Sequence, residues 1–314
     1  MQKQIEQNKY EEIKKKYEEI NKKFKNFTNL NSSQRKELIR EISDLNNKIK
    51  DNPNFGKMLE KEMNIILYDK DGKYNGNRFK IMAYWIRREE INKETLKLRD
   101  DNLAVIELIN EPSIRKRLNK TKEAIENLRN AEIEENVNNI KIRKYYLDII
   151  EIYRNSIEIA KERGVDYKGM LMGMEDAEKF NNFMVGQIDL SLAGLMSKEF
   201  AKIIYQHKSL FKNKKEYSNE EIHLMENIKK EIQTKIDQLT KNLENVKEIK
   251  ERSLSFFKKV ASGDKNISIE MVKEAAEKWK NFVPNAKKIE EQTKIEIEGL
   301  LLAYSALDRL QKAA

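Results

Sequence analysis

The chain contains no cysteine, only 3 prolines and only 10 glycines among its 314 residues. Without cysteine it forms no disulfide, offers no thiolate nucleophile and has no cysteine-ligated zinc or iron–sulfur site. Glycine and proline make up about 3% and 1% of the chain, against roughly 7% and 5% in average proteins. Because sheet proteins depend on frequent turns built from these residues, their scarcity favours long helices, which need few turns.

Long apolar runs are also missing. The sequence has no stretch of about 18 to 20 apolar residues, so it predicts no transmembrane helix. The first residues, Met1 to Ile5, lack the apolar core of a secretory signal peptide. The expected location is therefore cytoplasmic, or within a particle that assembles inside the cell.

Charged residues are abundant and nearly balanced in sign. They make up 37% of the chain, with 62 Lys and Arg against 53 Asp and Glu and a net charge of +9. Interspersed charges of both signs are typical of solvated helix faces, where residues four apart form ion pairs. A cationic surface that binds nucleic acid is the competing interpretation of the net charge.

Hydrophobic residues recur with heptad spacing near the N-terminus. The first such series is Tyr10, Ile13, Tyr17, Ile20, Phe24 and Phe27, and the second is Leu38, Ile42, Leu45 and Ile49. Each series forms a seam that needs a partner helix. Since residues 29–33 interrupt the pattern between them, the two segments are predicted to form an antiparallel helical hairpin that ends before Pro53.

The next helices are expected to be long. One covers residues 79–109, with a weak point at Asp100–Asp101, and another covers 112–163, with a weak point at Asn138–Asn139. Gly164 follows cations in the last turn and is a typical helix C-terminal stop.

Capping signals locate the C-terminal helices. Ser218 and Glu221 have capping-box spacing and predict the start of a helix that ends at Ser262–Gly263. Ser268 is expected to begin the last helical region, which Pro284 is expected to interrupt. The fold class is therefore predicted to be all-α, an elongated bundle of long antiparallel coiled-coil-like helices.

Residues 64–80 carry the strand signal of the chain. A short run rich in isoleucine, residues 64–68, leads into Asp71-Gly72 and Asn75-Gly76. Asp-Gly and Asn-Gly pairs are typical of tight turns between strands. A small β-hairpin is one interpretation of this region, and a helix end followed by a loop is the other.

Residues 164–196 differ in composition from the rest of the chain. This window holds five of the 10 glycines and five of the 11 methionines, and it is poor in cations. The predicted organisation is an N-terminal helical arm, residues 1–163, a Gly/Met-rich apolar central segment, residues 164–196, and a C-terminal helical arm, residues 197–314.

The central segment has three interpretations. It is a helix buried on all sides, an adaptable interaction surface in which methionines repack around a partner, or a conditional membrane-inserting element. The candidate interaction residues are Gly169, Met170, Met172, Gly173, Met174, Phe183, Met184, Gly186 and Gly194.

Catalytic and cofactor motifs are missing. The two histidines, His207 and His223, do not supply the two Glu-x-x-His pairs of a di-iron bundle. No catalytic residue, metal or cofactor is therefore predicted, although a site made only of Glu and Asp has no recognisable sequence pattern. The densest basic cluster is a candidate patch for phosphate groups or an acidic partner. It consists of Arg115, Lys116, Arg117, Lys120 and Lys122.

The expected function is that of a non-enzymatic structural, scaffolding or assembly protein. It works through helix–helix contacts with copies of itself or with another helical protein, for example as a virion component. Two alternatives remain open. One is an α-helical pore-forming or membrane-active toxin that uses residues 164–196, with the membrane as a conditional partner. The other is a basic nucleic-acid-binding protein that uses residues 115–122.

Overall fold

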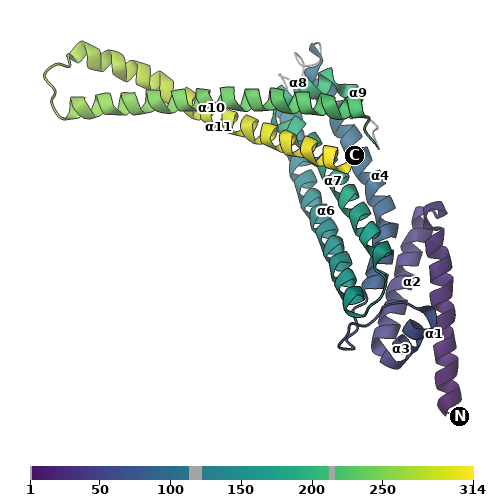
Figure 1. Cartoon of the computed structure of the whole chain (residues 1–314). Helices are drawn as coiled ribbons and strands as arrows, with labels where there is room; N and C mark the ends of the chain where they lie inside the picture. Colours follow the sequence, from purple (N-terminus) through teal and green to yellow (C-terminus); the bar gives the residue numbers. More distant parts are fainter. Residues whose placement is uncertain (1, 113–121, 212–215) are drawn as a thin grey trace. The chain divides into compact units, whose positions relative to one another are not determined.

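The computed structural model describes residues 2–112, 122–211 and 216–314, and over these ranges the protein is all-α (Figure 1). This part of the chain contains ten α-helices and one 3-10 helix, and no strand. The all-α prediction is therefore confirmed. The helices are α1 (Gln2–Lys25), η1 (Phe27–Asn29), α2 (Ser32–Asp51), α3 (Pro53–Met63), α4 (Asn77–Asn110), α6 (Lys122–Glu162), α7 (Lys168–Met196), α8 (Lys198–Gln206), α9 (Lys208–Phe211), α10 (Asn219–Ala261) and α11 (Ile269–Ala313).

The contacts divide the chain into two compact units. Unit 1 comprises residues 1–98 and 136–184, and unit 2 comprises residues 99–135 and 185–312. Three helices, α4, α6 and α7, pass from one unit into the other, so each unit combines segments that are distant in the sequence. The elongated shape and the three consecutive segments expected from composition remain predictions.

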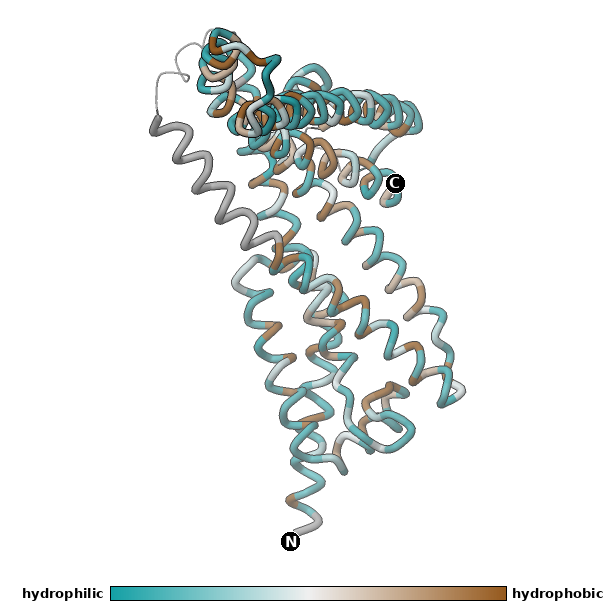
Figure 2. Tube along the Cα trace, turned by 90° about the vertical axis from the view of Figure 1, so that its left-hand side faces the viewer, coloured by the Kyte–Doolittle hydropathy of each residue, from teal (hydrophilic) through white to brown (hydrophobic). Residues whose placement is uncertain are grey.

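In unit 1, α1 and α2 form the helical hairpin that the heptad spacing predicts. Most seam residues are buried, whereas Phe24 and Phe27 at the end of the first series are only partly buried. Figure 2 shows hydrophobic positions that recur among hydrophilic ones along the helices. Asn31 begins α2 with a capping box, in which its side chain and that of Gln34 each accept the other's backbone N–H. The buried seam consists of Tyr10, Ile13, Tyr17, Ile20, Leu38, Ile42, Leu45 and Ile49.

The sequence did not predict α3, which packs against α1 and α2. Pro53 stands in its first turn, where a missing N–H costs nothing. Leu59 of α3 is fully buried in the same hydrophobic cluster as the seam residues. The short helix α3 therefore packs on the hairpin as a third helix.

The β-hairpin considered for residues 64–80 is not confirmed. The described region has one isolated antiparallel bridge, between Tyr68 and Tyr74, and no strand. The turn is instead organised by Asp69, whose Oδ1 accepts the backbone N–H groups of Asp71 at 3.0 Å and Lys73 at 2.7 Å. The result is a compact loop rather than a ladder.

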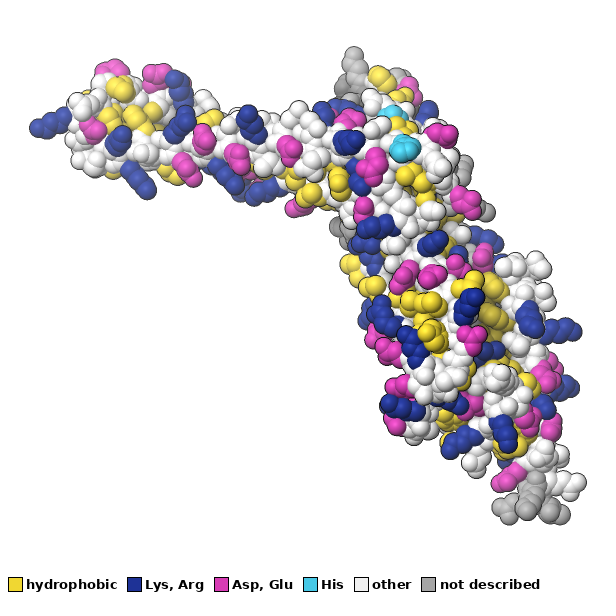
Figure 3. Space-filling model, in the orientation of Figure 1, with side chains coloured by type: hydrophobic (Ala, Val, Ile, Leu, Met, Phe, Trp, Pro, Cys, Tyr) yellow, Lys and Arg dark blue, Asp and Glu magenta, His cyan; other side chains and the backbone are white. Residues whose placement is uncertain are grey.

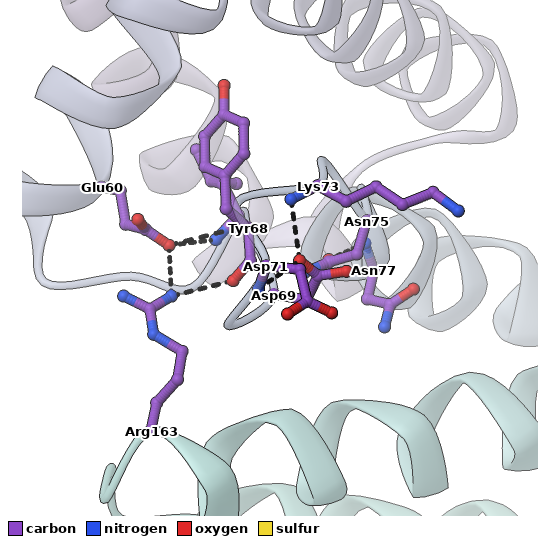
Figure 4. A network of polar contacts seen from close by, with 9 residues as sticks. Glu60, Tyr68, Asp69, Asp71, Lys73, Asn75, Asn77 and Arg163 are labelled. Carbon is purple, nitrogen blue, oxygen red and sulfur yellow. Dashed lines mark hydrogen bonds and ion pairs between the residues drawn. The ribbon is translucent and has the colours of Figure 1, made fainter.

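The Glu60 carboxylate of α3 joins this loop to the end of α6. Its Oε1 accepts hydrogen bonds from the N–H groups of Leu67 (2.8 Å) and Tyr68 (3.2 Å) and from Nη1 of Arg163 (2.7 Å) (Figure 4). Arg163 also donates to the Tyr68 carbonyl oxygen at 2.9 Å. Burial alone raises the pKa of Glu60, but these hydrogen bonds outweigh it and hold the pKa below its ordinary value.

Aromatic side chains form the second core of unit 1, between α4, α6 and the first half of α7. Trp85 Nε1 donates to the Tyr153 hydroxyl at 2.6 Å. The Arg88 guanidinium lies 4.6 Å from the ring centre of Trp85 and 4.0 Å from that of Phe180. Both distances are within the range of a cation–π interaction, so the arginine is held by two aromatic faces.

Unit 2 is built around the second half of α7. Every residue from Val185 to Gly194 is buried. The buried face of α11 includes Gly299, Ala303 and Ala306, which allow another backbone to approach closely. A Cβ added at Gly299 would lie 2.9 Å from the Cβ of Met196 and from the backbone N of Ser197, so only glycine fits at this crossing.

Two polar residues in the buried half of α7, Gln187 and Asp189, have partners within unit 2. Gln187 accepts a hydrogen bond from the buried Arg99 at 3.0 Å and donates to the Tyr217 hydroxyl at 2.6 Å. The Asp189 carboxylate lies 4.0 Å from Nε of Arg309 on α11. Because a buried polar group without a partner is costly, these contacts favour one arrangement of α4, α7 and α11 in this unit.

A carboxylate of α11 caps α8. Oε1 of Glu296 accepts hydrogen bonds from Oγ of Ser197 (2.5 Å) and the N–H of Glu199 (2.9 Å), and Oε2 accepts the N–H of Lys198 (3.0 Å). The first N–H groups of a helix have no partner within the helix, and a negative charge is favourable there. Glu296 therefore ties α11 to the start of α8.

The capping predictions are confirmed, and the predicted interruption is wrong. Ser218 and Glu221 form a complete capping box at the start of α10, and the Ser268 side chain accepts the N–H of Met271. However, α11 continues through Pro284 without a break. Pro284 is exposed, so water can satisfy the carbonyl that loses its helical partner. The expected weak point at Asp100–Asp101 is likewise helical.

We expect Glu60→Gln to lower the free energy of unfolding by about 1–3 kcal/mol at pH 7, because it replaces a charged acceptor of three hydrogen bonds. A carboxyl with a lowered folded pKa stabilises the protein above its unfolded pKa of about 4.3, and this contribution is lost as the pH falls through the folded pKa. The difference between variant and wild type in urea unfolding should therefore shrink at about pH 3.

Glu62→Gln is the matched control on the same helix. Glu62 pairs with Lys14 at 2.9 Å, and its side chain is 41% exposed, so solvent replaces much of the interaction. We expect a small effect for this variant. Equal losses in the two variants, or a loss at Glu60 that does not depend on pH, would contradict the role assigned to Glu60.

Candidate interaction surface

The predicted interaction residues in the second half of α7 lie in the core. Met184, Gly186 and Gly194 are all buried. A Cβ added at Gly186 would lie 2.9 Å from the Leu310 side chain, and one added at Gly194 would lie 2.6 Å from Ile106. These residues are therefore not accessible to a partner in this structure, which agrees with the interpretation of a helix buried on all sides.

The predicted residues in the first half of α7 are divided between core and surface. Met172 is 60% exposed, and a Cβ added at Gly169 would meet no atom within 4 Å. A Cβ added at Gly173 would instead lie 2.8 Å from the Tyr153 hydroxyl. The remaining candidates, Met170, Met174 and Phe183, are half-buried against the aromatic core of unit 1. Exposed Gly169 and Met172 alone do not form a groove.

The predicted basic patch falls outside the described part of the chain. Arg115, Lys116, Arg117 and Lys120 belong to residues 113–121, which the structure does not describe. Lys122 is the first residue of α6, and its side chain is not described. The phosphate-binding interpretation of this cluster remains a prediction.

The sequence did not single out the hairpin formed by the far ends of α10 and α11, here called the α10–α11 hairpin, residues 237–285. No residue in this range is buried. The two helices are held by side chains such as Lys250 and Glu290, which form an ion pair at 2.5 Å. Lys250 also holds the pKa of the Glu290 carboxyl below its usual value.

Aromatic side chains form an open groove along the α10–α11 hairpin. The ring centres of Phe257 and Trp279 lie 6.0 Å apart, and Trp279 lies 6.0 Å from Phe282. Phe256 and Ile249 extend the same wall, and the groove has a volume of about 370 Å³. Figure 3 shows hydrophobic side chains gathered among charged ones near the end of this hairpin.

The charges at the edge of the groove are already paired within their own helices. Arg252 pairs with Glu248 at 3.2 Å on α10, and Lys278 pairs with Glu274 at 2.5 Å on α11. The Lys278 ammonium lowers the pKa of the Glu274 carboxyl. The edge therefore carries ion pairs rather than an excess of one charge, and the groove floor is apolar.

Further apolar side chains are exposed near the groove. Leu254 is 51% exposed, Ile249 46% and Met271 48%. Contiguous apolar surface of this kind marks interaction sites more often than isolated exposed residues do. The arrangement can bind another apolar helix face.

The rest of the described chain shows no metal centre and no membrane span. Within residues 2–112, 122–211 and 216–314, no group of three or more His, Asp or Glu side chains is placed to hold a metal ion. None of the helices described in these ranges is both long and apolar enough to cross a membrane.

Comparison with known proteins gives no relative: no protein-family model, no curated protein and no solved structure matches the chain.

The two glycines of α7 that the sequence paired, Gly169 and Gly173, should respond oppositely to alanine. At Gly173 the new Cβ meets Tyr153, which is 4% exposed and held by Trp85. We expect Gly173→Ala to lose about 1–2 kcal/mol, because overpacking outweighs the gain in helix propensity. Gly169→Ala should gain less than about 1 kcal/mol. Urea unfolding of both variants measures this, and equal shifts would contradict the packing described for Gly173.

Proposed function

We propose that the protein is a non-enzymatic structural and assembly protein that self-associates through the groove of the α10–α11 hairpin. The observation that supports the proposal is the absence of any buried residue between Asp237 and Asn285, beside a continuous aromatic groove. Incorporation into a larger particle, such as a virion, is consistent with this function.

The physical argument concerns what stabilises a pair of helices. Helices in proteins are stabilised mostly by packing of an apolar face, and two helices alone leave one side of that face open to water. In the α10–α11 hairpin, Phe256, Phe257 and Trp279 are only half-buried. A further apolar helix face laid on the groove removes this surface from water at about 25 cal/mol per Å².

A second copy of the hairpin is a suitable occupant. Most homo-oligomers use two-fold contacts in which the same patch meets itself, and two hairpins packed together form a four-helix bundle. Because Arg252 and Lys278 are each paired with a glutamate of their own helix, the edges of two facing grooves do not place unpaired like charges together.

The membrane-active alternative has less support. It requires the second half of α7 to leave a site where all of its residues from Val185 to Gly194 are buried. It also requires Asp189, in the middle of that half, to lose Arg309 and enter hydrocarbon, which is costly.

We expect the wild-type chain to be a dimer or larger oligomer in light scattering after size exclusion. The double variant Ile249→Glu with Phe256→Glu should be monomeric, because two carboxylates in the groove prevent apolar burial. Its helix content by circular dichroism should not change, since both side chains lie outside the buried cores. A wild-type chain that is monomeric at every concentration would contradict the proposal.

Two controls make the test specific to the groove. Ile140→Glu places the same charge at a residue of α6 that is 67% exposed and should leave the oligomer intact. Because the chain has no cysteine, Ser253→Cys in the groove and Ser33→Cys on α2 each create a single thiol. Disulfide-linked dimers should form readily from the first and slowly from the second, and the reverse order would place the interface elsewhere.

A further inference from the structure

A second exposed feature of the α10–α11 hairpin is a row of alternating apolar residues and lysines on α11, here called the lysine stripe. Its members recur at spacings of four and three, so they share one face of the helix. All of them are exposed to solvent. The lysine stripe consists of Ile269, Lys273, Ala276, Lys280, Val283 and Lys287.

The lysine stripe and the aromatic groove lie on different sides of α11. The Trp279 ring contacts Phe257 of α10, so the direction of Trp279 marks the side of α11 that faces its partner helix. At 3.6 residues per turn, the groove residues of α11 are centred roughly 130° around the helix from the lysine stripe, and the direction toward α10 lies between the two. The lysine stripe is therefore on the other face of the hairpin from the groove.

The same face continues onto α10. Lys250 pairs with Glu290 of α11 and therefore marks the side of α10 that faces α11. A row of exposed residues lies beside Lys250 on the side away from the groove residues Ile249 and Phe256. Two lysines of α10 thus join the three lysines of the lysine stripe on one face of the hairpin. The row on α10 consists of Lys247, Leu254, Lys258 and Ala261.

This face of the hairpin carries cations without acidic residues in the same rows. Figure 3 shows Lys and Arg side chains that project along the hairpin. The ion pairs in the described hairpin use other cations, namely Lys250, Arg252 and Lys278. The glutamates form separate rows directed away from the partner helix, with Glu244, Glu248 and Glu251 on α10 and Glu270, Glu274 and Glu277 on α11. One face is therefore complementary to an anionic surface.

Exposed aliphatic side chains distinguish a lipid surface from other anionic partners. Ile269 is 69% exposed, Leu254 51% and Val283 37%. The phosphates of a nucleic acid offer such side chains no apolar environment, whereas the boundary between lipid headgroups and acyl chains accepts them. Lysines beside an apolar row can keep their methylene groups at this boundary and extend their ammonium groups to anionic headgroups.

We propose that this face of the α10–α11 hairpin binds the surface of an anionic lipid membrane. The three aliphatic side chains enter the headgroup boundary, and the five lysines contact the headgroups. The hairpin lies on the membrane and does not cross it. Because the groove is on the other face, the inference is independent of self-association.

The test is cosedimentation of the full chain with lipid vesicles. The chain should bind vesicles made of two parts phosphatidylcholine and one part phosphatidylserine, and it should not bind vesicles of phosphatidylcholine alone. Raising the salt concentration from about 0.1 M to about 1 M should release the chain, because the Debye length falls from about 10 Å to about 3 Å.

Substitutions separate the charge of this face from the charge of the whole chain. Lys273→Gln with Lys280→Gln should weaken vesicle binding about 25-fold, since each basic residue at an anionic membrane contributes about fivefold. Lys15→Gln with Lys22→Gln is the matched control, because these two lysines are also exposed and seven residues apart but lie on α1. The control pair should bind vesicles like the wild type.

One further variant tests the aliphatic contact. Ile269→Ser should weaken binding to anionic vesicles severalfold and leave the helix content unchanged, because Ile269 is an exposed residue in the first turn of α11. Light scattering of Lys273→Gln with Lys280→Gln should give the particle size of the wild type. A loss of vesicle binding is then distinguishable from a loss of self-association.

Four outcomes would overturn the inference. The first is a chain that does not sediment with anionic vesicles, and the second is equal binding to neutral and anionic vesicles. The third is an equal loss of binding in the two lysine pairs, which indicates an effect of net charge alone. The fourth is wild-type binding by Ile269→Ser together with displacement of the chain from vesicles by duplex DNA, which indicates a nucleic-acid partner.

Discussion

The close packing of α11 on the second half of α7 is the constraint on which unit 2 depends. A Cβ added at Gly299 would lie 2.9 Å from the backbone N of Ser197, and one added at Gly186 would lie 2.9 Å from the Leu310 side chain, so both crossings need glycine. This contact uses the most apolar stretch of the chain as core, from Val185 to Gly194. The far ends of α10 and α11 lie outside this contact, and residues 237–285 contain aromatic and aliphatic side chains but no buried residue.

In unit 1, the loop of residues 64–76 packs Ile65, Leu67 and Tyr68 into the hydrophobic cluster, and polar contacts also hold its backbone. Glu60 and Arg163 hold the loop backbone with charge-assisted hydrogen bonds, and each of these is stronger than a neutral one. The aromatic core beside it places several tyrosine hydroxyls out of water, among them those of Tyr84, Tyr145 and Tyr146. Both the loop and the aromatic core of this unit therefore contain polar groups that are removed from water.

Heptad spacing and capping residues predicted individual helices correctly, but they did not predict which distant segments contact one another. The heptad spacing identified the buried seam of α1 and α2, and Ser218 with Glu221 identified the start of α10. The strand signal at residues 64–68 gave only one isolated bridge, because Glu60 accepts the N–H of Leu67, which would otherwise pair with Asn75. Glu60 lies on α3, and no periodic pattern in the sequence links it to this loop.

The same reasoning explains why the groove was not found in the sequence. Phe257 and Trp279 follow the helical period whether a third helix covers them or not, so spacing predicts that they face a partner without saying that the partner is missing. Whether these two residues belong to a core or to an interface depends on how many helices surround them in the folded structure. The apolar segment from Val185 to Gly194 is already buried, whereas the aromatic side chains of the α10–α11 groove remain partly exposed to water. Another helix face packed on the groove would bury these side chains without any change in the fold of either unit.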